Sequence, residues 1–301
     1  MKILIIGSKG FIGKHTLDYF RQQNTIEAWG CDVIFDTNDT HYFCISPDSS
    51  DFNEIFRQHD FNVCINCSGA ASVPDSIQHP WRDYQLNTIN VFKQLEAIRQ
   101  FRPNCKYINL SSAAVYGNPI EKPITENTQI NPISPYGSHK VQAELICKEF
   151  YTYFNIQTCM LRIFSAYGEG LKKQLFWDLY QKTKTNKEIV LFGTGKESRD
   201  FIYVHDLVTV IDLVIQNANF IGEAINVANG YEVTIQETAT VFYNNFNEKI
   251  NFSFSDEARK GDPNNWLADI STLKSYGYQP KFSLEQGLNN VYKWIQKIEN
   301  E

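Results

Sequence analysis

Short apolar segments alternate with longer amphipathic segments through the first half of the chain, and this alternation limits the fold more than any other feature. Apolar segments of this length are typical of strands that are buried on both faces. Strands that each precede a helix form a parallel sheet with helices on both faces, because the crossovers are right-handed. We therefore predict an α/β fold with a doubly wound parallel sheet. The expected strands are Lys2–Ile6, Ile26–Cys31, His41–Ile45, Val63–Cys67, Tyr107–Leu110 and Thr158–Phe164, and the expected helices are Phe11–Gln22, Trp81–Arg102 and Pro135–Phe154.

The second half of the chain has a different rhythm, with shorter strands that lie further apart. The expected strands are Ile189–Phe192, Phe201–Val204, Ala224–Val227 and Asn251–Ser253, and the expected helices are Leu207–Gln216, Ile235–Asn245 and Ser283–Lys297. We predict a first domain over residues 1–165 and a smaller α/β lobe over residues 166–301. The lobe is expected to be discontinuous, with part of about residues 199–220 returning to the first domain.

Composition excludes several classes of protein. The chain has 301 residues, of which 43% are hydrophobic and 21% charged, so a folded core is expected. The net charge of -6 argues against nucleic acid as a partner. The opening MKILIIG is too short for a signal core or a membrane span, so we expect a cytoplasmic protein without a membrane partner. Cys64 and Cys67 lie in an expected strand, where residues three apart point to opposite faces, so no metal site is predicted.

A strand, a glycine-rich turn and a helix follow one another at the start of the chain, in the segment IIGSKGFIG. Gly7 permits the tight turn, Gly10 lets phosphates approach the backbone, and Gly13 lets the helix pack closely on the strand. The helix N-terminus then points at a pyrophosphate, which its N–H groups and dipole favour. Glycines at this spacing also occur in simple tight connections, so the motif needs support from elsewhere in the chain.

Asp32 supplies that support, because it lies nineteen residues after Gly13, at the end of the second expected strand. A carboxylate there can accept hydrogen bonds from the adenosine ribose and would repel a ribose phosphate. Val33 follows it, where a cation would favour the phosphate. These residues predict a Rossmann domain that binds NAD, with NADP as the alternative. Asp36 is a nearby competitor for the ribose role.

Tyr136 and Lys140 are four residues apart in SPYGSHK, on a helix that Ser134 caps and Pro135 starts. Residues at this spacing share one helix face. A neighbouring ammonium and an oxidised nicotinamide both stabilise a phenolate, and so lower the pKa of the phenol from about 10. The pair can then exchange a proton with a sugar hydroxyl while hydride moves at the carbon. An isolated pair of this kind is also typical of an ordinary helix surface.

Ser111 and Ser112 end the fifth expected strand, in YINLSSAAVYG. Ligands of open parallel sheets bind beyond the carboxyl ends of the strands. A hydroxyl at this position can therefore contact the reacting sugar oxygen and align it with the tyrosine. The loop Gly117–Asn131 follows, and it is long enough to act as a functional flap.

Together these segments resemble the extended short-chain dehydrogenase/reductase family, and within it the NAD-dependent nucleotide-sugar epimerase/dehydratase group. The resemblance runs nearly from end to end. Its segments, in the family's order, are GSKGFIG, INCSGAAS, YQLNTINV, SSAAVYG, YGSHK, LRIFSAYG, GTGKESRDFIYVHDL and GDPNNWLADISTLKSYGYQP. The resemblance implies an enzyme that uses a nicotinamide dinucleotide to move hydride to or from a carbon of a nucleotide-diphosphate sugar. It also implies a homodimer.

The resemblance assigns roles to individual residues. Catalysis would rest on Ser112, Tyr136 and Lys140, with Tyr136 as the acid/base. The cofactor-binding residues would be Gly7, Gly10, Phe11, Ile12, Gly13, Asp32, Ser68, Gly69, Ala70, Asn87, Ser111, Tyr136 and Lys140. The substrate-binding residues would be Ser112, Ser165, Arg199, Arg259 and Asp262. The arginines suit a diphosphate because their planar donors match phosphate oxygens. Most relatives have Asn at the position of Ser165.

Three enzyme reactions share this set of residues. The family's dehydratases normally carry Asp–Glu after the active-site Ser/Thr, whereas this chain has Ala113 and Ala114, which cannot move protons. We therefore favour C4 epimerisation through a transient 4-keto sugar, which is redox-neutral. Reduction of a 4-keto-6-deoxysugar at the expense of NAD(P)H is the first alternative. A non-catalytic dinucleotide sensor is the second, since one fold serves many functions. The nucleotide and the sugar are not identified by the sequence.

Overall fold

The computed structural model describes residues 1–185, 188–257 and 263–300. Within these residues, seven strands form one parallel sheet. Their spatial order is β11 (Ile221–Val227), β6 (Thr158–Ile163), β5 (Lys106–Ser112), β4 (Val63–Asn66), β1 (Lys2–Ile6), β2 (Glu27–Asp32) and β3 (Tyr42–Cys44). The chain winds from β1 to one side through β2 and β3, and then to the other side through β4, β5 and β6. This arrangement confirms the predicted doubly wound sheet.

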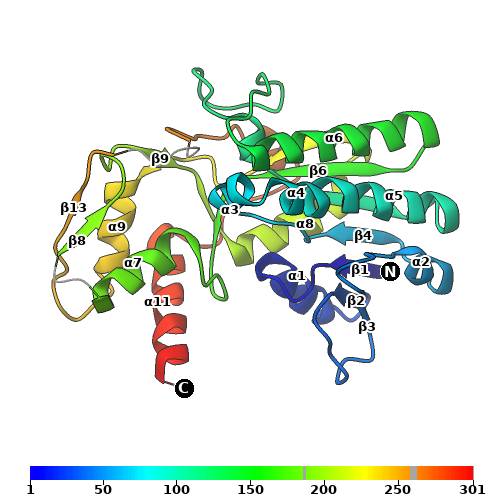
Figure 1. Cartoon of the computed structure of the whole chain (residues 1–301), viewed down its shortest axis with the longest axis horizontal. Helices are drawn as coiled ribbons and strands as arrows, with labels where there is room; N and C mark the ends of the chain where they lie inside the picture. The colour runs from blue at the N-terminus through cyan, green and yellow to red at the C-terminus, as the bar shows by residue number, and fades with distance from the viewer. Residues whose placement is uncertain (186–187, 258–262, 301) are drawn as a thin grey trace.

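Helices cover both faces of the sheet (Figure 1). On one face lie α1 (Phe11–Arg21) and α8 (Val204–Asn217), and on the other lie α2 (Asn53–Gln58), α5 (Asn90–Phe101) and α6 (Pro135–Phe154). Strand β1 shows why both faces of the sheet are buried. Ile3 and Ile5 pack in the first core, and Leu4 and Ile6 pack in the second, because successive side chains point to opposite faces.

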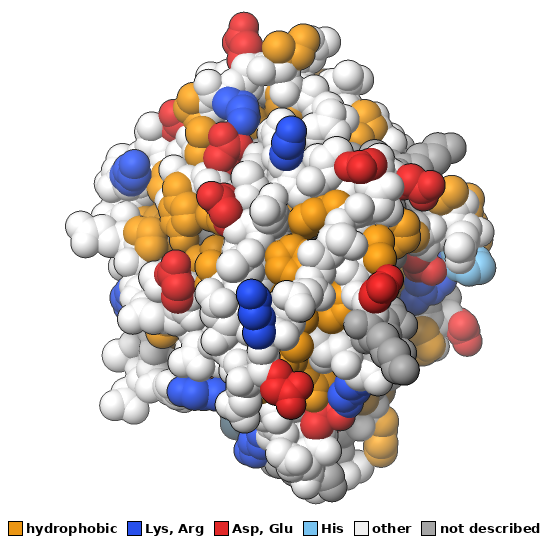
Figure 2. Space-filling view, turned by 90° about the vertical axis from the view of Figure 1, so that its left-hand side faces the viewer, with side chains coloured by type: hydrophobic (Ala, Val, Ile, Leu, Met, Phe, Trp, Pro, Cys, Tyr) orange, Lys and Arg blue, Asp and Glu red, His pale blue; other side chains and the backbone are white. Residues whose placement is uncertain are grey.

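The remaining elements form a lobe at one end of the sheet, on the left in Figure 1. Its helices are α7 (Gln174–Thr185), α9 (Ile235–Tyr243) and α11 (Leu284–Asn300). Its strands pair two by two among the described residues: β7 (Ser165–Tyr167) with β10 (Phe201–Tyr203), β8 (Ile189–Leu191) with β13 (Phe252–Phe254), and β9 (Ser198–Arg199) with β12 (Val233–Thr234). Aromatic side chains dominate its core, and the outer face in Figure 2 mixes hydrophobic with charged groups.

Two segments differ from the sequence prediction. The helix expected over Trp81–Arg102 is three pieces: α4 (Pro80–Tyr84), the π-helical segment η1 (Gln85–Ile89) and α5. The strand expected over Ala224–Val227 begins earlier, and it is the edge strand of the large sheet beside β6. The elements that the sequence did not predict are α2, α7, β7, β9, β12, α3 (Val73–Gln78), η2 (Ala113–Val115) and α10 (Ser271–Ser275). No helix in the described part of the chain is long and apolar enough to cross a membrane.

Candidate active site

A cleft of about 840 Å³ opens where the carboxyl ends of the central strands meet the lobe. The part of the chain that forms the large sheet contributes the turn before α1, the segment after β4, the end of β5 and the first turns of α6. The lobe contributes residues of α7 and the surroundings of Arg199. Of the residues predicted from the sequence, the cleft lining includes Gly10, Phe11, Ile12, Ser68, Gly69, Ala70, Ser111, Ser112, Tyr136, Lys140, Ser165 and Arg199.

The glycine turn forms an anion-binding cradle in front of α1. Gly7 has a φ of +80°, and its carbonyl accepts the N–H of Gly10 at 3.0 Å, so the chain turns directly after β1. A Cβ on Gly13 would lie 2.0 Å from the Gly7 carbonyl oxygen, so only glycine lets α1 pack this closely. No side chain of the described residues caps the N-terminus of α1 at Gly10, and its first turn carries no acid. Its N–H groups and dipole therefore suit a phosphate.

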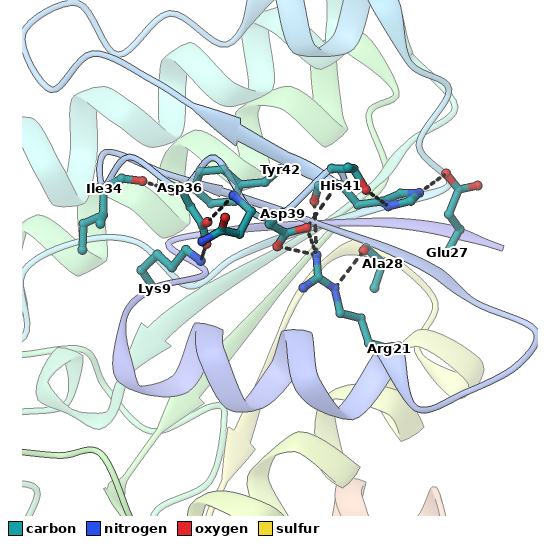
Figure 3. A network of polar contacts seen from close by, with 11 residues as sticks. Lys9, Arg21, Glu27, Ala28, Ile34, Asp36, Asp39, His41 and Tyr42 are labelled. Atoms are coloured by element: carbon teal, nitrogen blue, oxygen red, sulfur yellow. Dashed lines mark hydrogen bonds and ion pairs between the residues drawn. The ribbon is translucent and has the colours of Figure 1, made fainter. Parts of the chain in front are cut away.

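Asp32 lies beside this cradle at the end of β2. Its Oδ2 accepts the N–H of Lys9 at 2.8 Å, and its Oδ1 accepts the N–H of Val33 at 2.7 Å. Each oxygen keeps a further lone pair for a hydroxyl donor. Asp36, the alternative acceptor for the ribose, already has a partner, because it forms an ion pair with the Lys9 ammonium (Figure 3). The hydrogen bond from Lys9 lowers the pKa of Asp36.

Asn87 lies below the floor of the cleft, within η1. It is 1% exposed, and its side-chain amide has no hydrogen-bond partner among the described residues. A Cβ on Gly69 would meet the Asn87 Oδ1 at 2.5 Å, so the backbone after β4 passes directly over this amide. Buried amides are normally hydrogen-bonded, and an unpaired one marks a place where a water or a ligand is expected. The cradle, Asp32 and Asn87 together fit a bound dinucleotide.

The predicted catalytic residues come together at the cleft. Ser134 caps α6 by accepting the N–H of Gly137 at 3.1 Å, and Pro135 occupies the first turn, as the sequence predicts. This start places half-buried Tyr136 against Ser112 at the end of β5. The Lys140 ammonium lies 5.8 Å from the centre of the Tyr136 ring and donates to the Leu110 carbonyl at 2.8 Å.

Burial governs the protonation of both groups. It lowers the pKa of Lys140 to about 8, although the carboxylates of Asp83 and Glu144 act in the opposite direction. Burial raises the pKa of Tyr136 to about 12, while a hydrogen bond with the Ser112 hydroxyl lowers it. The protein groups alone therefore keep the phenol neutral beside an ammonium. The low phenol pKa expected from the sequence requires the further positive charge of an oxidised nicotinamide.

A buried ion pair supports the same helix from behind. Arg162 of β6 and Glu144 of α6 approach to 2.7 Å, and both side chains are 2% exposed. The Ser111 hydroxyl donates to the Glu144 Oε1 at 2.6 Å. Ser111, predicted to bind the cofactor, therefore lines the cleft while its hydroxyl points into this cluster. The sequence shows only a serine at the end of a strand, and this pattern does not distinguish cofactor binding from a hydrogen bond to Glu144.

The substrate side is less completely described. Ser165 lies in β7 at the cleft, and Arg199 of β9 donates to the carbonyls of Ser198 (2.9 Å) and Asn264 (3.2 Å). The Arg199 guanidinium lies 5.7 Å from the centre of the Trp266 ring. Arg259 and Asp262, also predicted to bind substrate, lie outside the described residues. Within those residues, no group of three or more His, Cys, Asp or Glu side chains could hold a metal.

The model of the NAD dependent epimerase/dehydratase family matches residues 3–228. The chain belongs to this family. An uncharacterized UDP-glucose epimerase of Bacillus subtilis is 27% identical, over 99% of this chain and 99% of the relative. The family name confirms NAD, the cofactor that the sequence predicts.

Solved structures of similar proteins agree with this membership in the epimerase/dehydratase family. UDP-N-acetylglucosamine 4-epimerase from Methanobrevibacter ruminantium, in complex with UDP-N-acetylmuramic acid, is 27% identical with a TM-score of 0.87, over 99% of this chain and 98% of that one. UDP-glucuronic acid 4-epimerase from Bacillus cereus, in complex with UDP-glucuronic acid and NAD, has a TM-score of 0.89 at 24% identity, over 99% and 100%. The second comparison shows the shared fold.

Proposed function

We propose that the chain is an NAD-dependent nucleotide-sugar 4-epimerase. The observation that carries the proposal is the meeting of Ser112, Tyr136 and Lys140 in one cleft with the glycine cradle of α1. A dinucleotide held at the cradle would supply the hydride acceptor, and Tyr136 would supply the proton acceptor, in the same cleft. Family membership and the 4-epimerases among the similar structures support this choice of reaction.

The residues that would hold the dinucleotide follow from the geometry. The Gly10 N–H is used within the turn, where it donates to the Gly7 carbonyl at 3.0 Å, so the N–H groups of Phe11 and Ile12 would face the pyrophosphate. Asp32 would accept hydrogen bonds from the adenosine ribose. Lys140 and Tyr136 would hold the nicotinamide ribose, with Ser68–Ala70 as further lining of the cleft. When bound, the dinucleotide supplies the hydride acceptor and donor for the sugar carbon. Arg199 contacts the diphosphate of the substrate.

The proton is handled by the protein. Tyr136, as phenolate, takes the proton from the C4 hydroxyl as hydride leaves C4, which forms a 4-keto sugar. Ser112 donates a hydrogen bond to the developing carbonyl oxygen and keeps it near the phenol. The keto sugar turns within the cleft and presents its other face. Hydride then returns to C4 and Tyr136 returns the proton, so the reaction consumes neither reductant nor oxidant.

The short helix η2 argues against dehydration. It follows Ser112 directly, and its residue Ala114 lines the cleft with a methyl group. A dehydratase needs groups there that remove a proton from C5 and protonate the leaving hydroxyl at C6. Ala113 is fully buried and cannot serve either. A dTDP-D-glucose 4,6-dehydratase is among the similar proteins, so family membership alone does not choose the reaction.

The proposal extends to the whole protein. Residues 1–165 form most of the dinucleotide-binding domain, and residues 166–301 mainly bind the nucleotide sugar. We propose a cytoplasmic homodimer that forms through α5 and α6. Exposed hydrophobic side chains on these helices support the dimer: Phe92, Leu145, Tyr153 and Phe154.

A panel of nucleotide sugars tests the reaction. The purified protein is incubated with UDP-glucose, UDP-N-acetylglucosamine, UDP-glucuronic acid and their GDP, CDP and dTDP counterparts, with and without NADPH. An epimerase converts one of them to its C4 epimer, seen by NMR, without net change in absorbance at the nicotinamide band. Loss of NADPH with a 4-keto sugar would instead identify a reductase. Dinucleotide binding without any product would identify a sensor.

A further inference from the structure

Lys9 lies in the glycine turn, and its backbone and its side chain have different partners. Its N–H donates to the Asp32 Oδ2 at 2.8 Å, so the lysine side chain starts directly beside the carboxylate that would hold the adenosine ribose. Its ammonium forms an ion pair with Asp36 (Figure 3). The sequence has no cation directly after Asp32, where Val33 stands, but the fold brings one to this place from the turn before α1.

The partners of this ammonium are themselves held in place. The Lys9 Nζ lies over the Tyr42 ring, 4.7 Å from its centre, in the position of a cation–π contact. The Tyr42 hydroxyl donates in turn to the Ile34 carbonyl. The Asp36 carboxylate is oriented by the chain that follows it, since its Oδ1 accepts the N–H of Asn38 at 3.0 Å. The loop after β2 and the first residue of β3 therefore hold the lysine ammonium between them.

The charges at this place bear on which dinucleotide the site accepts. A ribose hydroxyl can donate to Asp32, whereas a 2′-phosphate offers that carboxylate mainly acceptors and negative charge. The Lys9 ammonium could offset this repulsion, because lysine has a flexible stem and binds phosphate as a point charge. The ion pair with Asp36 already neutralises it, and the two side chains are only 26% and 24% exposed, so water screens the pair incompletely.

We infer that Asp36 is a specificity-determining residue: it holds the Lys9 ammonium and so keeps the site selective for NAD over NADP. The inference rests on the dinucleotide site of the proposed function and not on the reaction at the sugar. It gives the two acids of this region separate roles. Asp32 receives the ribose hydroxyls, and Asp36 pairs with the cation that would otherwise bind a ribose phosphate.

A competition between the two dinucleotides tests this inference without turnover. The full chain is dialysed to equilibrium against equal concentrations of NAD and NADP at about 0.15 M salt, where direct repulsion across solvent is largely screened. The bound dinucleotides are then released and quantified by chromatography. Asp36→Asn keeps the oxygen that accepts the Asn38 N–H and removes the charge. In this variant we expect the bound ratio of NADP to NAD to rise by about fivefold, the order of effect of one partly exposed charge pair.

Lys9→Met identifies the group through which Asp36 acts. This variant removes the ammonium and keeps both the apolar stem and the backbone N–H that binds Asp32. In the Lys9→Met background, Asp36→Asn should change the ratio by less than about twofold, because no cation is left to release. Asp39→Asn is the matched control. It removes a carboxylate of the same loop that pairs with Arg21 at 2.7 Å, and it should leave the ratio unchanged.

The binding ratio and the conversion of nucleotide sugars are measured separately, so the outcomes are distinct. A rise in Asp36→Asn that disappears with Lys9→Met supports the inference, even where no nucleotide sugar is converted and the proposed reaction is refuted. An equal rise in both backgrounds overturns it, since Asp36 would then act by its own charge. An unchanged ratio in Asp36→Asn also overturns it, and normal conversion would leave the proposed function intact. A chain that binds neither dinucleotide overturns both.

Discussion

The sheet region and the lobe position their residues by different means. In the sheet region, a strand such as β5 has seven residues; it pairs with β4 over Lys106–Asn109 and with β6 over Tyr107–Ser112, so backbone pairing extends to its last residue. In the lobe, β8 has three residues and β9 two. Packing between aromatic rings positions these short strands instead. The Phe242 ring centroid, for example, lies 5.7 Å from those of Phe176 and Phe246.

We expect this difference to separate the residues of the proposed reaction from the residues that bind substrate. Ser112 ends β5, and Tyr136 and Lys140 lie in the first two turns of α6, so long regular elements hold all three residues. Arg199 lies on a two-residue strand whose place depends on aromatic neighbours such as Trp266. We expect changes in the sheet region to affect kcat and dinucleotide binding, and changes in the lobe core to affect substrate affinity.

The largest effect should come from Tyr136→Phe. Loss of the acid/base lowers kcat by about 10³-fold, within the range of general acid–base catalysis. NAD binding, measured by calorimetry, should change by less than about twofold because one hydroxyl is lost among many contacts. Tyr153→Phe is the matched control, on the same helix but 75% exposed, and should keep full activity. A fully active Tyr136→Phe would refute the catalytic assignment.

Gly13→Ala should unfold the dinucleotide cradle. Its new Cβ would meet the Gly7 carbonyl at 2.0 Å, and backbone cannot yield as a side chain does. We expect a loss of about 3 kcal/mol in the free energy of unfolding and of detectable NAD binding. Gly277→Ala in the C-terminal part has a φ of +86° but nothing within 4 Å, so only the backbone strain of about 1 kcal/mol remains. Denaturant unfolding measures both, and equal losses would contradict the packing argument.

Lys140→Met should abolish activity and stabilise the fold. The pKa of Lys140 falls from its ordinary 10.5 to about 8, so burying its charge costs about 3 kcal/mol below pH 8. Loss of the bond to the Leu110 carbonyl offsets about 1 to 2 kcal/mol. We expect a net gain of about 1 to 2 kcal/mol at neutral pH. The gain shrinks as pH rises from about 8 to 10.5, where the wild-type lysine is neutral in both states. Urea unfolding at several pH values checks this, and a gain that grew with pH would contradict it.

The smallest effects should separate the two regions most sharply. Phe242→Leu in the lobe core and Ile108→Val in the sheet core each remove little volume and should cost about 1 kcal/mol. We expect only Phe242→Leu to raise the KM for the nucleotide sugar, by a few fold, with kcat and NAD binding unchanged. If Ile108→Val raised the KM equally, it would contradict the expectation that only changes in the lobe core affect substrate affinity.

The same contrast explains how much the sequence could predict. The helix Pro135–Phe154 has the predicted bounds, because a serine cap and a first-turn proline mark its start. The predicted catalytic residues and the glycine turn could be brought together from the sequence because they lie in or next to such elements. Strands β7, β9 and β12 were not expected in these places, since two or three residues carry no periodicity and pair only through tertiary contacts.

Two features of the site had no usable signal in the sequence. The π-helical segment η1 replaces a turn of what the sequence presents as one continuous amphipathic pattern, and it lies in contact with α6. The second feature is the contact between the His139 imidazole and the Asp83 carboxylate. The two residues are 56 positions apart, so no local sequence pattern links them.

The edge strand β11 has a consequence for how the protein is made. Strand β6 ends at Ile163, but its outer neighbour is completed only at Val227, after most of the lobe's first half has been synthesised. A nascent chain that stops short of this point exposes the unpaired backbone of β6 as a template for other strands. Neither region can therefore be excised as a contiguous fragment, and a split into separately expressed halves should be sought beyond residue 227.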